Sequence, residues 1–468
     1  MPIIKPLRLL SAALLVSLLC GCSGTFMGND RQLMRPPYPA GEEKNIQEEL
    51  IKQLGNVTLK YPKSGAYRSA ILRTRLTRDN EHEKDDALVF YREKESEPIS
   101  LAILNRTEKG WRLTATKKSE GGEVDRVMFG DIDNDGVNEI IVGWTMYSTG
   151  LNIISAYSFD GSRIMPIEVR EFSEAEATNV SVAYTDMQIG DFDNDDCDEI
   201  IASYLNLSEV TATAKLIEFH HGVDNSNAMS VTDTAPLDGH VLSYADAKVA
   251  KLTDDNIIGV VLDGNKDNST MITEYVYWDM ISGDLKTPFY NEDEKTVTDT
   301  VRNLYTTARD IDSDGVMEIP VTSFLPGYDQ ASDNPVYLTS WYSVDFEAEG
   351  CSFISRKKTV INPADNYSVT WQSSWNDRVT CRIDPNNHIL YFYHYRKDKF
   401  AFSDEIFRIK VYSTDEWDNA LSSANESGST PVYSVLAKDG DNLYVALFSL
   451  GQDFVDVKSV ASYFNLLQ

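Results

Sequence analysis

The chain has 468 residues and a formal net charge of −30, from 73 acidic and 43 basic side chains. Such an excess of negative charge repels nucleic acid and anionic lipid head groups, which argues against both as binding surfaces. Apolar residues make up 42% of the chain and aromatic residues 10%, so the composition supports a folded protein with a hydrophobic core.

Residues 1–21 have the features of a secretory signal. Two basic residues precede an apolar run from Leu9 to Leu19, which is too short to span a membrane as a mature helix. Gly21 stands directly before Cys22, which resembles the lipobox of bacterial lipoproteins. We therefore expect removal of residues 1–21 and a lipid on Cys22 that anchors the protein to a membrane. The alternative is a plain secretory signal cut nearby, and both interpretations give an extracytoplasmic protein.

A tether and a short helix are expected next. Residues 22–41 have no apolar period and read as a flexible tether. Within residues 42–56, Ile46, Leu50 and Leu54 recur every fourth position and Gly55 follows, which predicts an amphipathic helix. We expect this helix to pack on the flank of the domain formed by residues 57–468; a partner-binding helix is the alternative.

An acidic loop followed by an apolar strand occurs three times, at residues 131–139, 191–199 and 310–318. Each loop has carboxylates at positions 1, 3, 5 and 9, and four such charges that converge repel one another unless a hard cation lies between them. The loops are not EF-hands, because the EF-hand glutamate stands at position 12 and helices flank that loop. The pattern predicts three calcium sites in a repeat architecture.

These motifs resemble the FG-GAP/VCBS repeat family, in which D-x-D-x-D-G-x-x-[DE] lies in the turn between two strands of a propeller blade. The resemblance covers roughly residues 57–450 and implies about three structural calcium ions. In the second loop Asp196 replaces the glycine, and Asp tolerates the positive φ of that position better than most residues. The alternative is that each acidic loop is only a solvent-exposed turn that binds no metal. The resemblance implies as ligands the side chains of Asp131, Asp133, Asp135, Glu139, Asp191, Asp193, Asp195, Glu199, Asp310, Asp312, Asp314 and Glu318, and the carbonyls of Val137, Cys197 and Val316.

The number of repeats follows from strand–turn–strand pairs that lack the acidic loop. Four such pairs are expected over residues 75–91, 248–262, 379–393 and 432–447. With the three acidic loops they make seven units, so we predict an all-β, seven-bladed propeller that closes into a ring, with six or eight blades as alternatives. A short acidic helix is expected near 414–421, and a closing helix or strand within 455–467.

Cysteine and histidine patterns add little chemistry. Besides Cys22, three cysteines follow the signal segment, which allows one disulfide; sequence does not fix the pairing, but Cys351–Cys381 is favoured because both residues fall in neighbouring units. His220 and His221 are adjacent on a strand, so their side chains face opposite sides and cannot act together.

The sequence contains no G-x-S-x-G, H-E-x-x-H or glycine-rich phosphate motif. We therefore predict a monomeric, non-enzymatic platform that binds a protein of the cell envelope or an extracellular glycan. A carbohydrate-active enzyme of the polysaccharide lyase type and an envelope assembly factor are the alternatives.

Overall fold

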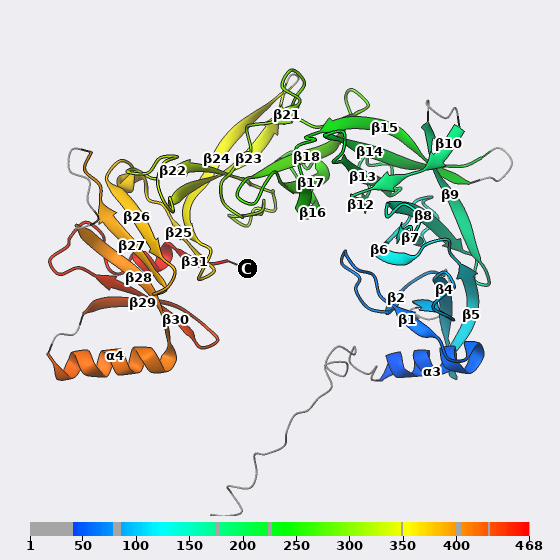
Figure 1. The fold of residues 1–468 in the computed structure, drawn as a ribbon, viewed down its shortest axis with the longest axis horizontal. Helices are drawn as coiled ribbons and strands as arrows, with labels where there is room; N and C mark the ends of the chain where they lie inside the picture. Colours follow the sequence, from blue (N-terminus) through cyan, green and yellow to red (C-terminus); the bar gives the residue numbers. More distant parts are fainter. Residues whose placement is uncertain are drawn as a thin grey trace, which may run out of the picture.

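The chain folds into a row of antiparallel β-sheets that bends into an arch, with the N-terminal sheet at one end and the C-terminal sheet at the other (Figure 1). The computed structural model describes residues 41–77, 86–173, 178–222, 227–347, 350–397, 402, 404–428 and 431–467. Residues 1–21 and Cys22, the expected signal and lipid site, lie outside this part of the chain. In the described residues, strands dominate and the α-helices are α3 and α4, so the all-β class is confirmed.

The first sheet carries the N-terminal helix. Helix α3 spans Glu42–Leu54, as the apolar spacing predicted, and Gly55 ends it with a φ of 77°. Ile46 and Leu50 are fully buried against the sheet beside Trp111, so the helix covers the free face of the first sheet at the end of the arch (Figure 1). The strands of this sheet are β1 (Thr58–Lys60), β2 (Ile71–Thr74), β3 (Asp86–Arg92), β4 (Ser100–Thr107) and β5 (Gly110–Lys118).

The second and third sheets are joined at their outer edges, where β9 and β15 pair in parallel. Each sheet is otherwise an antiparallel meander that starts on the concave side of the arch. The strands of these two sheets are β6 (Glu123–Gly130), β7 (Glu139–Thr145), β8 (Asn152–Phe159), β9 (Ile164–Ser173), β10 (Thr178–Ser181), β11 (Ala183–Tyr184), β12 (Asp186–Gly190), β13 (Glu199–Asn206), β14 (Thr211–His220) and β15 (Ala228–Leu237).

The fourth and fifth sheets lie at the crest of the arch. The hairpin expected over residues 248–262 is present, since Lys248 of β16 pairs with Val261 of β17. The C-terminal strand β31 joins the fifth sheet through β25. The strands are β16 (Ser243–Lys251), β17 (Ile258–Asn265), β18 (Met271–Asp279), β19 (Asp284–Lys286), the small pair β20 (Tyr290–Asn291) and β21 (Thr296–Val297), and then β22 (Ile319–Phe324), β23 (Tyr337–Phe346), β24 (Cys351–Asn362), β25 (Tyr367–Thr370) and β31 (Phe464–Leu466).

The last sheet changes the predicted blade count. The two hairpins expected over residues 379–393 and 432–447 both form, but β30 pairs with β28, so they belong to one sheet. The described residues therefore make six blade-like units, and the predicted seven are not confirmed. The elements are β26 (Val379–Asp384), β27 (Ile389–His394), β28 (Glu405–Ser413), α4 (Thr414–Glu426), β29 (Val432–Asp439) and β30 (Asn442–Phe448), with short 3-10 turns at Ser373–Trp375 and Val460–Ser462.

The hydrophobic core is divided among the contacts between successive sheets. One apolar cluster joins the first and second sheets, and four further clusters join each later sheet to the next. Alternate strand residues thus serve two neighbouring interfaces, which is how blades of a propeller pack.

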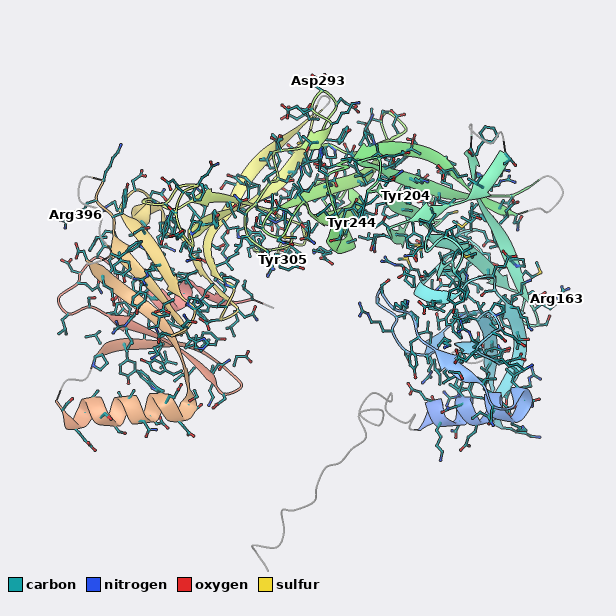
Figure 2. The ribbon with its side chains drawn as sticks, in the orientation of Figure 1. Arg163, Tyr204, Tyr244, Asp293, Tyr305 and Arg396 are labelled. Carbon is teal, nitrogen blue, oxygen red and sulfur yellow. The ribbon has the colours of Figure 1, made fainter. Side chains whose placement is uncertain are left out.

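The expected ring is not closed in this structure. Figure 1 shows the first and last sheets at opposite ends of the arch, and the closing segment pairs within the fifth sheet instead. Strands β6, β12 and β16 line the concave side, where Figure 2 places Tyr244 and Tyr305, while Asp293 lies at the crest.

Candidate functional site

The three acidic loops adopt one backbone shape. Two of them connect the first two strands of a unit, β6 to β7 and β12 to β13, and the third leads into β22. Position 4 has a positive φ in every loop, and so does position 6, including Asp196 with a φ of 69°. Asp196 therefore takes the conformation that glycine takes in the other two loops, as the sequence predicted.

Hydrogen bonds repeat in the loops as closely as the backbone does. In the first loop, Asp131 accepts from the N–H groups of Asp135 and Gly136 at 2.9 and 2.8 Å, and Asp135 accepts from Val137 at 2.8 Å. Glu139 accepts from the N–H of Ile132 at 3.3 Å, which ties the end of the loop to its start. The second and third loops have the same set of bonds.

The carboxylates at positions 1, 3 and 9 converge in each loop. Each residue offers an oxygen that lies within 4.8 Å of the others, in the groups Asp131, Asp133 and Glu139; Asp191, Asp193 and Glu199; and Asp310, Asp312 and Glu318. The position-5 residues Asp135, Asp195 and Asp314, also expected as ligands, are not in these close groups. The expected carbonyl ligands of Val137, Cys197 and Val316 stay predictions.

Electrostatics make these groups suited to a cation. Burial and the neighbouring aspartates raise the pKa of Glu139 and of Glu199 to about 8, and that of Glu318 to about 7. Two oxygens of these carboxylates, Oδ1 of Asp133 and Oε1 of Glu318, are buried and have no hydrogen-bond partner. A hard cation would supply the missing partner and neutralise the charge, so the residues fit an ion bound through oxygen ligands.

A second feature is a cavity of about 590 Å³ on the concave side of the arch. Strands β6, β12 and β16 contribute its wall, and residues 64–68 cover one side. The rings of Tyr67 and Phe129 both line this cavity and lie edge to face, with their centroids 5.1 Å apart. We call it the inner-wall cavity.

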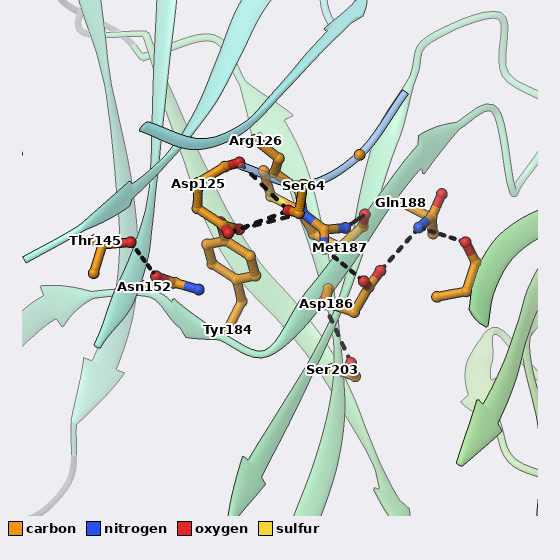
Figure 3. Close-up of polar contacts among 12 residues, drawn as sticks. Ser64, Asp125, Arg126, Thr145, Asn152, Tyr184, Asp186, Met187, Gln188 and Ser203 are labelled. Carbon is orange, nitrogen blue, oxygen red and sulfur yellow. Dashed lines mark hydrogen bonds and ion pairs between the residues drawn. The ribbon is translucent and has the colours of Figure 1, made fainter. Parts of the chain in front are cut away.

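Polar contacts fix the floor of the inner-wall cavity, as Figure 3 shows. Arg126 donates to Asp186 at 2.6 Å and to the carbonyl of Met187 at 3.1 Å. Gln188 donates to Asp186 at 2.9 Å and to the carbonyl of Ala247 at 3.0 Å, which links the third sheet to the fourth. These residues come from strands 60 positions apart in the chain, so no local motif marks them.

A tyrosine reaches this network from behind the wall. The hydroxyl of Tyr184 donates to Asp125 at 2.6 Å, and Ser64 donates to the same carboxylate at 3.1 Å. Gly143 makes room for the Tyr184 ring, because a Cβ at residue 143 would lie 1.8 Å from the Tyr184 hydroxyl oxygen. The glycine is therefore required for the close approach of the ring.

The disulfide favoured by the sequence, between Cys351 and Cys381, is absent from the described residues. Cys197, Cys351 and Cys381 are all free thiols among the described residues. Cys381 is fully buried in the core between the fifth and sixth sheets, whereas Cys351 packs at the core between the fourth and fifth. Two neighbouring units in sequence thus place their cysteines in different interfaces.

The structure also reveals a histidine–aspartate pair that the sequence did not single out. His388 Nδ1 lies 2.6 Å from Asp365 Oδ1, and Asn362 donates to the other carboxylate oxygen at 2.9 Å. The His388 side chain is 60% exposed and that of Asp365 only 4%, beside a cavity of about 490 Å³ that Glu416 and Tyr444 also line. The two residues are 23 positions apart, which explains why spacing did not connect them.

Comparison with known proteins gives no family. No family model matches the chain, and no curated protein matches it. In the part of the chain that the structure describes, no helix has both the length and the hydropathy to cross a membrane.

Solved structures share only a distant likeness to the arch. A rhamnogalacturonan lyase, YesW, is 11% identical with a TM-score of 0.30 and covers 72% of this chain and 74% of its own. The Dos1 propeller is 10% identical with a TM-score of 0.29, over 72% of this chain and 70% of the Dos1 chain. Zg3597, a family 117 glycoside hydrolase produced by the marine bacterium Zobellia galactanivorans, is 11% identical with a TM-score of 0.26, over 60% and 86%.

Proposed function

We propose that this chain is an extracytoplasmic lipoprotein, anchored through Cys22, whose blade-like sheets are stabilised by calcium and form a non-enzymatic binding platform. In this proposal the sheets are a variant of the FG-GAP/VCBS repeat propeller. Calcium is the ion of choice because the expected ligands are all oxygen atoms, which are the ligands that a large, hard cation prefers.

The inner-wall cavity is the observation that carries the binding role. It spans three consecutive sheets, so its shape depends on the packing that the loops stabilise. Its floor is preorganised, since Arg126 and Gln188 are already held by Asp186 and by backbone carbonyls. Concave sites with a few fixed polar groups are where ligands usually bind.

The charges of the cavity favour a neutral, polar ligand. The lining holds two arginines, Arg68 and Arg126, and two aspartates, Asp186 and Asp246, so its formal charges balance. Arg126 is paired with Asp186, and Asp246 accepts from Lys248 at 2.8 Å. A charged ligand would have to compete with these pairs, whereas a sugar can bond through its hydroxyls to the remaining polar atoms and stack the C–H face of its ring on Tyr67. We therefore propose the neutral end of an extracellular or envelope glycan as the ligand.

The test is a binding assay on the full chain in calcium and again in chelator. Neutral glycans, acidic glycans and envelope proteins are offered, and Tyr67→Ala is compared with Tyr305→Ala. Tyr305 is 70% exposed on the concave side but does not line the cavity, so it is a matched control. We expect calcium-dependent binding of neutral glycans that Tyr67→Ala alone weakens about tenfold, or about 1.4 kcal/mol. Binding of acidic glycans or proteins alone would refute the ligand class, and no binding at all would refute the platform.

A carbohydrate-active enzyme is the second candidate, and the His388–Asp365 pair favours it. A buried carboxylate that orients an exposed imidazole leaves the second ring nitrogen available as a general base. Incubation with polyuronic acids, followed by ultraviolet detection of unsaturated products, tests this function. Turnover that His388→Ala abolishes and Asp365→Asn reduces would support it, and absence of product from every polymer offered would count against it.

A further inference from the structure

We propose that Asp198 couples the first two metal loops, so that an ion in the second loop preorganises the first. Asp198 occupies position 8 of the second loop and is not among the ligands expected for any of the three sites. The inference rests on the proposed calcium sites and adds a positioning residue between them.

Asp198 binds the backbone of a residue in the other loop. Its Oδ2 accepts from the N–H of Asp131 at 2.9 Å, and its own N–H donates to the carbonyl of Asp131 at 2.9 Å. Asp131 is position 1 of the first loop, where its carboxylate holds two N–H groups and belongs to the close group of three. Asp198 thus fixes both backbone polar groups of a residue that would bind the first ion.

The same residue is rigidly linked to the second site. Asp198 directly precedes Glu199, which is 4% exposed and accepts from the N–H of Phe192 at 2.9 Å. An ion that orders Asp191, Asp193 and Glu199 would therefore also order the peptide of Asp198. Since binding free energies are reciprocal, an ion in the first loop should strengthen the second site by the same factor.

Space for the Asp198 side chain is built into the second sheet. Gly130 ends β6 beside Asp131, and a Cβ at this position would lie 2.8 Å from Asp198 Oδ2 and 2.4 Å from Ile189 Cδ1. Gly190 ends β12 at the matching place, yet a Cβ there would meet nothing closer than 3.6 Å. The two glycines have the same position in their units but only Gly130 is needed for the contact between loops.

The third loop provides an internal comparison. Its position-8 residue is Met317, whose N–H donates to the carbonyl of Lys251 at 3.0 Å. The backbone link to the preceding unit is therefore repeated, but a methionine side chain does not return a carboxylate bond. Lys251 is not an acidic-loop residue, so the third site should bind its ion independently.

Calcium titration calorimetry on the full chain tests the coupling. Asp312→Ala first removes the third site, which should lower the stoichiometry from three to two, and the remaining two sites should fill cooperatively. Adding Asp193→Ala leaves only the first site. This site should then bind calcium about tenfold more weakly than it does when the second site is intact, a factor within the range usual for coupled sites. Asp198→Ala should weaken calcium binding at the first site by a similar factor. Asp193→Ala and Asp198→Ala together should weaken it no further than either change alone.

Matched variants separate positioning from charge. Asp198→Asn can still accept the N–H bond of Asp131, so it should restore most of the affinity that Asp198→Ala loses. Gly130→Ala should weaken the first site, whereas Gly190→Ala should leave it unchanged. If Asp198→Asn and Asp198→Ala are equally weak, the effect is one of net charge and the positioning role is refuted.

Folding is followed by far-ultraviolet circular dichroism in chelator, where an unchanged spectrum shows that a variant keeps its fold. If Asp198→Ala fails this control, Asp198→Asn and the two glycine variants decide. Two independent sites that ignore Asp198 would overturn the coupling but leave the calcium assignment intact. No binding to the unmodified chain would instead overturn the calcium sites themselves.

Discussion

Breaking the buried pair Arg302–Asp263 should destabilise the crest of the arch severely. Both side chains have no exposed surface, and Arg302 donates to Asp263 at 2.6 Å. Asp263 also accepts from Thr273 at 2.6 Å and from the N–H of Ala308 at 2.9 Å, so it anchors the segment that leads into the third loop. Arg302→Met would leave this carboxylate charged, buried and without its cation. Removing one partner of such a pair costs about 3–5 kcal/mol, a large part of the ~5–15 kcal/mol that stabilises a typical domain.

Urea unfolding followed by tryptophan fluorescence measures the loss. Adding Asp263→Asn to Arg302→Met should recover part of the stability, because it removes the uncompensated charge while keeping side-chain hydrogen bonds. Arg163→Met is the control, since Arg163 and Asp160 form an exposed pair at 3.0 Å that should contribute little to stability. A loss below about 1 kcal/mol for Arg302→Met, or no recovery in the double variant, would refute the reasoning.

Four further outcomes are expected. Chelation should lower the melting temperature, because saturation at ~100 times the dissociation constant contributes about 2.7 kcal/mol per independent site; an unchanged melt would refute the metal assignment. Asp133→Ala and Asp312→Ala should each reduce stability in calcium but not in chelator, as calorimetry can check. Burial raises the pKa of Glu274 from 4.5 to about 8, so the folded state binds more protons and stability should fall as pH rises from about 4.5 to 8; Glu274→Gln should make that slope shallower in unfolding titrations by the part that Glu274 contributes. Cys22→Ser should release the protein from membranes on fractionation, and continued retention would exclude the lipid anchor.

Local patterns in the sequence predicted local structure well. Helix α3 begins and ends where the spacing of Ile46, Leu50 and Leu54 placed it. The acidic loops form with positive φ at the expected positions, even where Asp196 replaces glycine. Such features depend on residues within about ten positions, whose periodicity and turn chemistry can be read directly.

Contacts between distant residues were beyond the reach of these patterns. The hairpin of β29 and β30 was correctly placed, but its pairing with β28 depends on an edge that the hairpin's own residues do not specify. Arg126 and Asp186 are 60 positions apart, and Asp198 meets Asp131 across 67. In the sequence, Asp186 and Asp198 look like solvated surface charges until the sheets are packed together.

The division of the core among successive sheets has a consequence for how the protein unfolds. The extensive contacts between sheets in the described residues join consecutive sheets, as in a stack whose members interact with nearest neighbours. Loss of the first sheet would expose a single interface and leave the others intact. Removal of the last sheet would also take β31, which follows it in the chain, from the fifth sheet. Unfolding is then expected to proceed in steps from the N-terminal end of the arch, and mild proteolysis should yield a ladder of fragments that lose whole sheets from that end.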